Sequence, residues 1–254
     1  MAGAYSIEEI GRFIQRYKTF VQGASDLRLH QFMQRFGHVR TALEALADLD
    51  RHSQRRLASR FNLFRALRVE RREVRTHSAF LAELFRPNGT HAQGTLFLEG
   101  FLQHCLRKGD EFNHFPRIEF PTGAASWEVD CEKSIPDGQL DIVVWSLQSR
   151  FLMVIENKID AAEQKDQIGR YQDWLSGRRE YPRDRRVLIY LTPDGRRAST
   201  ASNEDYFCLS YARDVVAWLR SALPNVEAPR VRDAVIQYLD LLGILFDIGV
   251  EMER

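Results

Sequence analysis

Lysine is scarce in this sequence. Only five of its 36 basic residues are lysines, namely Lys18, Lys108, Lys133, Lys158 and Lys165, and the rest are arginines. Net charge is scarce too: 35 acidic residues leave a formal charge of +1, which excludes a histone-like basic tail and an acidic solvating domain. Arginine binds phosphate well through paired hydrogen bonds, but a GC-rich genome produces the same excess, so composition alone identifies no partner.

Cysteine is also rare, and the three that occur are widely separated (Cys105, Cys131 and Cys208). Without a CxxC pair they support neither a disulfide framework nor a zinc cluster. Strictly apolar runs, such as residues 151–155, reach only five residues, far short of the roughly 20 residues of a membrane span. The first 13 residues place two glutamates where a signal peptide needs apolar residues. We therefore expect a cytoplasmic protein with no membrane partner.

The apolar pattern changes its period along the chain. Helical spacing predicts helices over 10–21, 26–46, 51–67, 70–85 and 94–107. Later apolar runs predict strands over 117–120, 127–133, 140–145 and 151–159, a helix over 162–175, strands over 187–191 and 207–210, and helices over 212–222 and 229–249. This order predicts an α/β fold, a mixed sheet flanked by helices. Residues 1–65 form an N-terminal helical segment that, without a flexible linker, is expected to pack on the core formed by residues 66–254.

The two strands over 140–145 and 151–159 are predicted to form a hairpin. A turn centred near residues 148 and 149 pairs Trp145 with Leu152 and Asp141 with Glu156. Directly opposed side chains in an antiparallel pair lie about 5 Å apart, so the two carboxylates repel each other unless a cation lies between them. Lys158 follows Glu156 by two residues and projects from the same face.

Two carboxylates at the end of a buried strand suit Mg²⁺ or Mn²⁺ better than zinc. Such an ion can activate a water molecule and stabilise charge on a scissile phosphate, and Lys158 could assist by orienting that water. The alternative is that Glu156 and Lys158 mark the solvated end of a strand while Asp141 lies in a turn. Spacing alone leaves both interpretations open.

Polar side chains at two helix starts favour a site. In the helix over 70–85 the apolar stripe extends backward to His77 and Glu73, and in the helix over 162–175 the first turn carries Gln167, followed by Tyr171. A lone inward histidine is more often a core residue than a ligand, and each helix start alone is better explained by partial exposure. Their combination with the carboxylate pair predicts one polar cleft.

These residues resemble the PD-(D/E)XK nuclease superfamily, which has the restriction-endonuclease-like fold. More narrowly, they resemble a bacterial group with four motifs: E-x3-HS at 73–78, a G-R-x-D-like strand at 138–141, I-E-N-K-I at 155–159 and Q-x3-Y at 167–171. The resemblance covers roughly residues 61–195. It implies that residues 66–254 form a nuclease domain.

The resemblance also implies roles for individual residues. Asp141 and Glu156 would bind Mg²⁺, with Mn²⁺ as a substitute, and Lys158 would assist phosphodiester hydrolysis. Glu73 would add a further metal-binding carboxylate, and the remaining motif side chains would line the site or contact substrate (His77, Gln167, Tyr171). Gln139 departs from the arginine that the group often has. Asp137, in a literal Pro-Asp pair, is a rival for the metal aspartate, but its Pro-Asp-Gly turn favours Asp141.

Two arginine clusters, within residues 51–86 and 178–197, provide local positive charge for a nucleic-acid partner. No recognition helix, zinc finger or P-loop accompanies them. From the resemblance we expect a magnesium-dependent endonuclease that acts on DNA, in bacterial defence against foreign DNA. The rivals are a ribonuclease and a non-catalytic binding module on the same fold, and the N-terminal helices are candidates for forming a homo-oligomer.

Overall fold

The computed structural model describes residues 7–58, 61–108, 127–160, 163–199, 201 and 205–248. The chain divides into two compact units, Met1–Phe61 and Asn62–Arg254, which are described here one at a time. The strand predicted over 117–120 lies outside the described residues. No helix in the described ranges is long and apolar enough to cross a membrane.

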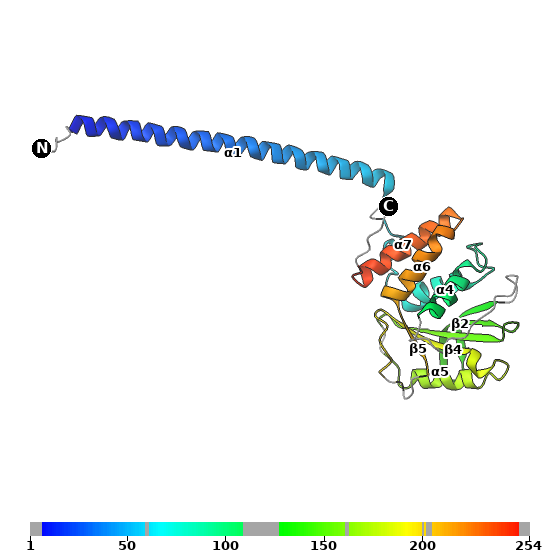
Figure 1. Cartoon of the computed structure of the whole chain (residues 1–254). Coiled ribbons are helices and arrows are strands. Elements are labelled where there is room, and N and C mark those ends of the chain that lie inside the picture. Colours follow the sequence, from blue (N-terminus) through cyan, green and yellow to red (C-terminus); the bar gives the residue numbers. More distant parts are fainter. Residues whose placement is uncertain are drawn as a thin grey trace. The chain divides into compact units, whose positions relative to one another are not determined.

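The first unit contains a single long helix, α1 (Ile7–Leu57), drawn in blue to cyan in Figure 1. The prediction of separate helices over 10–21, 26–46 and from 51 onward is wrong, because no proline interrupts this stretch and its three glycines remain helical. The helix ends at Leu57, and Ala58 follows with a φ of 44°, a left-handed conformation that stops a helix. The predicted packing of residues 1–65 on the core stays a prediction.

The second unit is built around a five-stranded sheet in the order β1-β2-β3-β4-β5. Strands β1, β2 and β3 pair antiparallel, and β3, β4 and β5 pair parallel. The predicted mixed sheet is therefore confirmed, with these bounds: β1 Glu128–Ile135, β2 Gly138–Ser146, β3 Phe151–Asn157, β4 Arg186–Thr192 and β5 Phe207–Ser210.

Helices cover both faces of this sheet (Figure 1). One face packs against α3, α4, α6 and α7, and the other packs against α5. Every residue of β3 is buried, as its continuous apolar run predicted. The helical elements of the unit are α2 Leu63–Ala66, a π-helical turn Glu73–Ser78, α3 Ala79–Phe85, α4 Leu96–Arg107, α5 Gln167–Ser176, a 3₁₀ turn Arg183–Arg185, a π-helical turn Tyr211–Val215, α6 Val216–Ala222, a 3₁₀ turn Leu223–Asn225 and α7 Pro229–Leu245.

Two predicted helices near the site begin later than expected. The helix predicted from residue 70 starts at Glu73, because the side chains of Thr76 and His77 bond the carbonyls of Val69 and Glu70 and hold the preceding segment in a turn. The helix predicted over 162–175 starts at Gln167, preceded by residue 166 with a left-handed φ of 49°. In both cases local side-chain or backbone conformation, which periodicity does not encode, sets the helix start.

Candidate active site

The hairpin places Asp141 and Glu156 side by side at the end of the sheet. The pairing of β2 with β3 has the predicted register, with Trp145 opposite Leu152 and Ile142 opposite Ile155. Asp141 and Glu156 each lie one residue beyond this last pair. Oδ2 of Asp141 accepts a hydrogen bond of 2.7 Å from the backbone N–H of Asn157, which holds this carboxylate against the end of β3.

Glu156 is buried without adequate hydrogen-bonding partners. Its exposed fraction is 1%, and among the described residues neither carboxylate oxygen receives an aligned hydrogen bond. Burial and the neighbouring charge of Asp141 raise the pKa of Glu156 to about 8, although Lys158 opposes the shift. Burial also raises the pKa of Asp141 to about 6. A buried carboxylate in such surroundings is stable as an anion only when a cation is close.

Lys158 is that nearby cation within the chain. Its Nζ lies 2.8 Å from Oε1 of Glu156 and 3.8 Å from Oε1 of Glu73. Burial by itself lowers the pKa of Lys158, but the charges of these carboxylates and of Asp141 outweigh burial and raise the pKa above its ordinary value. The side chain is therefore an ammonium ion at neutral pH, shared between two carboxylates.

Glu73 reaches the same place from the start of the π-helical turn. Its Oε2 accepts hydrogen bonds from the backbone N–H groups of Ile159 at 2.6 Å and Asp160 at 3.3 Å. Arg71 adds a salt bridge of 2.9 Å to the carboxylate of Asp160. Glu73 thus fastens the segment that follows β3, and in this conformation one of its two carboxylate oxygens is already bonded to backbone.

The oxygen donors at this point fit a magnesium or manganese ion. Asp141 and Glu156 supply two adjacent carboxylates, and hard divalent cations prefer oxygen ligands. Within the described ranges no three side chains of His, Cys, Asp or Glu converge closely enough to hold an ion by themselves. A bound ion would therefore take its further ligands from backbone carbonyls, water or substrate oxygens, as Mg²⁺ commonly does.

Helix α5 contributes Gln167 and Tyr171 beside this strand end. Nε2 of Gln167 donates to the hydroxyl of Tyr171 at 2.8 Å, and that hydroxyl donates to the carbonyl of Gln139 at 2.6 Å. Burial, and then the negative charge of Glu156, raises the pKa of Tyr171 to about 12. These two side chains hold α5 on β2 at the edge of the site.

His77 lies in the helical core. Its ring is fully buried, with Nδ1 2.8 Å from the hydroxyl of Tyr238 and Nε2 2.9 Å from the carbonyl of Glu70. A carbonyl can only accept, so Nε2 carries the proton and Nδ1 accepts from the tyrosine. Burial lowers the pKa of His77, which favours this neutral form. The structure brings together the other six predicted site residues and leaves His77 as a support behind them.

Asn157 is a functional candidate that sequence reasoning missed. Between Glu156 and Lys158 it points to the opposite face of β3, where it is fully buried. Its Oδ1 accepts from the hydroxyl of Tyr211 at 2.9 Å, and its Nδ2 donates to Oγ of Ser78 at 3.0 Å. Asn157 therefore ties the strand end that carries the site to two helical segments behind the sheet.

Glu163 was also missed, and no pattern in the sequence distinguishes it. Its carboxylate accepts from the hydroxyl of Tyr190 at 3.0 Å and from the backbone N–H of Ser199 at 2.6 Å, and it lies 3.4 Å from Arg196. Tyr190 is the β4 residue paired with Glu156. Glu163 thus joins the loops that follow β3 and β4, at the end of the sheet that bears the site.

Asp137, the rival metal aspartate, lies in the exposed turn between β1 and β2. Its carbonyl accepts a hydrogen bond of 3.0 Å from Arg170. The partly buried and carboxylate-paired position of Asp141 fits a metal ligand better than this turn does.

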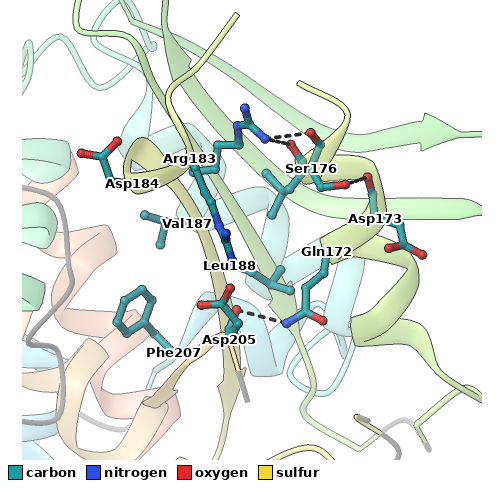
Figure 2. Close-up of a pocket in the computed structure, with 11 residues that line it drawn as sticks. Gln172, Asp173, Ser176, Arg183, Asp184, Val187, Leu188, Asp205 and Phe207 are labelled. Atoms are coloured by element: carbon teal, nitrogen blue, oxygen red, sulfur yellow. Dashed lines mark hydrogen bonds between the residues drawn. The ribbon is translucent and has the colours of Figure 1, made fainter. Parts of the chain in front are cut away.

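A separate cavity of about 830 Å³ lies away from the strand ends (Figure 2). It is formed by the C-terminal half of α5, the 3₁₀ turn before β4, and the beginnings of β4 and β5. Figure 2 shows Gln172 bonded to Asp205 across it, with Ser176 bonded to Asp173 beside it. None of the predicted site residues lines this cavity.

Comparison with known proteins identifies the family. Residues 61–240, more than two thirds of the chain, match the family model of the PD-(D/E)XK nuclease superfamily. No curated protein and no solved structure gives a significant match. The match includes the whole strand-end arrangement of carboxylates and lysine described above. The chain therefore belongs to the PD-(D/E)XK nuclease superfamily.

Proposed function

We propose that the protein is a metal-dependent endonuclease that hydrolyses phosphodiester bonds of DNA. The observation that carries the proposal is the Glu156 carboxylate, which is buried beside Asp141 and which, among the described residues, has an ion pair with Lys158 but no aligned hydrogen bond. Lys158 is shared with Glu73 and leaves an excess of negative charge in the site. A divalent cation held by Asp141 and Glu156 would offset that excess.

Each residue then has a definite role. When bound, Mg²⁺ would activate a water molecule and stabilise the charge that develops on the scissile phosphate. Lys158 remains protonated because its carboxylate neighbours raise its pKa, so it supplies positive charge and hydrogen bonds and does not act as a base. Glu73 fixes the segment carrying Ile159 and Asp160 next to that lysine. Gln167 and Tyr171 form the wall of the site on the α5 side.

DNA is the substrate we favour, recognised through its backbone. Arg72 and Arg75, near Glu73, and Arg196 and Arg197, in the loop after β4, are exposed around the strand ends. Such side chains suit phosphate contacts, which position a nucleic acid without reading its bases. Defence against foreign DNA in a bacterial cytoplasm is the biological setting that we propose for this activity.

The test is cleavage of plasmid DNA, single-stranded DNA and RNA by the full chain with Mg²⁺ or Mn²⁺. We expect cleavage of DNA that stops when the metal is chelated. Glu156→Gln and Lys158→Met should each reduce the rate at least about 100-fold, the usual cost of removing a group that stabilises charge in the transition state. Circular dichroism would establish that both variants are folded.

Asp137→Asn is the matched control, because it removes an aspartate of the same hairpin from an exposed turn and should cleave like the native chain. Cleavage of RNA alone would replace DNA by RNA as the substrate. Binding of nucleic acid without any cleavage would favour the non-catalytic module. Full activity in Glu156→Gln would show that cleavage does not depend on the proposed active site.

A further inference from the structure

Helix α1 presents an apolar stripe that nothing in its own unit covers. Six described apolar side chains lie on it with exposed fractions between 41% and 62%: Ile14, Tyr17, Val21, Val39, Leu43 and Leu46. Within each of the two groups, 14–21 and 39–46, the apolar residues follow one another at intervals of three or four residues. Val21 and Val39 are 18 residues apart, which is five turns of an α-helix, so the two apolar groups share one face, with the exposed Arg28 and Arg35 between them. At 100° per residue, all six positions fall within a sector of about 80°.

The helix needs a partner in order to be stable. Helices in water obtain most of their stability from packing of an apolar face, and not from intrinsic propensity. Gly11, Gly23 and Gly37 weaken α1 further, since each is a poor helix former and the space around each is open. A long helix that carries three such residues and an uncovered apolar stripe requires another surface along its length.

The length of α1 distinguishes between the possible partners. The stripe from Ile14 to Leu46 spans about 48 Å of the helix, whereas a globular domain of the size of the second unit is about 40 Å across. A straight helix touches a rounded domain over just part of that diameter, so covering all six side chains at once calls for an elongated surface. An identical helix offers a stripe of equal length and the same chemistry.

We propose that α1 is an association helix that pairs with the α1 helix of a second copy of this chain. The 18-residue repeat matches a straight α-helix, so little supercoiling is expected in the paired helices. The residues directly opposite the stripe are polar, among them the exposed Thr41 and Glu44, while further exposed apolar side chains such as Phe13 and Leu49 lie beside the stripe. The pairing is independent of the proposed nuclease activity, because it involves no residue of the strand-end site.

Sedimentation equilibrium of the full chain tests this proposal. The chain has a mass of 29.6 kDa, and we expect an assembly of at least twice that mass which dissociates on dilution. The double variant Val39→Glu and Leu43→Glu places two charges in the stripe, and it should weaken association at least about tenfold, which is 1.4 kcal/mol. Helicity measured by circular dichroism should fall with dissociation, because the unpaired helix is marginal.

The double variant Thr41→Glu and Ala45→Glu is the control. It adds the same charges about half a turn away, on the opposite face, and should associate like the native chain. A native chain that stays monomeric up to about 100 μM, or a stripe variant that associates as strongly as the control, would overturn the proposal. The mass measured for the native chain tests self-association even if the stripe variant misfolds.

Discussion

Glu156 and Asp141 share one environment, and its electrostatics determine what the site can do. Both side chains are largely buried, and burial is the main reason that the pKa of Glu156 rises to about 8 and that of Asp141 to about 6. Lys158 offsets part of the repulsion through its contact of 2.8 Å with Glu156. Without a divalent ion, the two carboxylates therefore destabilise the folded protein at neutral and alkaline pH.

This repulsion predicts how Glu156→Gln changes stability with pH. Between the ordinary glutamate pKa of 4.5 and the folded value of about 8, the folded state binds a proton that the unfolded state has released. The native free energy of unfolding therefore falls as pH rises through that window, whereas glutamine does not titrate. In the presence of EDTA, the stability of Glu156→Gln relative to the native chain should increase from pH 5 to pH 8.5 by at least about 1 kcal/mol, the equivalent of roughly one pKa unit.

Urea unfolding at the two pH values measures this difference. An equal difference between variant and native chain at pH 5 and pH 8.5 would mean that Glu156 ionises without a penalty, contrary to the environment described for it. Restoring Mg²⁺ at pH 8.5 should stabilise the native chain more than the variant, because only the native chain retains both carboxylates.

Some individual residues could be predicted from the sequence and others could not. The symmetry of the hairpin fixes Asp141 opposite Glu156, and the apolar run before Glu156 indicates that its carboxylate is buried. His77 was harder to place, because periodicity shows that a side chain faces inward but not whether it meets a cleft or a bonding partner. Its partner Tyr238 lies 161 residues away. Contacts of that separation leave no local pattern.

At the scale of elements, the end of β3 connects the site to β4 and to the helical segments behind the sheet. Its backbone continues the parallel ladder through the N–H of Lys158, which donates to the carbonyl of Leu191 at 2.8 Å. On one face Glu156 and Lys158 form the site, and on the other Asn157 bonds Ser78 and Tyr211. The helical segments behind the sheet thereby help to set the position of the strand end.

Tyr211→Phe tests this connection. The change removes the hydroxyl that donates to Oδ1 of Asn157 and leaves that buried oxygen unsatisfied, so the free energy of unfolding should fall by about 1–3 kcal/mol. Denaturant unfolding measures the loss. Ser176→Ala, which removes an exposed hydroxyl at the end of α5, is the control and should change stability by less than about 0.5 kcal/mol. A loss no larger than that of the control would mean that the bond contributes nothing to the strand end.

Element boundaries depended on how strongly the local sequence defines them. Strands β2 and β3 were predicted closely because apolar runs and turn residues delimit them. The start of the helical segment at Glu73, which leads into α3, was missed because Thr76 and His77 bond carbonyls that precede it. The single helix α1 was divided in the prediction at polar interruptions, which a helix exposed to solvent tolerates without breaking.

At the scale of the whole molecule, a formal charge of +1 conceals an uneven distribution of charge. Three carboxylates and one ammonium group meet at the strand ends, while exposed arginines lie on the segments around them. The net charge reveals neither the acidic site nor the exposed arginines around it. The same neutral chain thus combines an acidic site suited to a divalent ion with surroundings suited to a polyanion.

The central claim is that Asp141 and Glu156 together hold the divalent ion on which cleavage depends. Titration calorimetry with Mn²⁺ tests it most directly, by comparing the native chain with Asp141→Asn and with the turn variant Asp137→Asn. We expect the native chain and Asp137→Asn to bind Mn²⁺ alike, and Asp141→Asn to bind at least about tenfold more weakly. Unchanged binding in Asp141→Asn, or weakened binding in Asp137→Asn alone, would contradict the account.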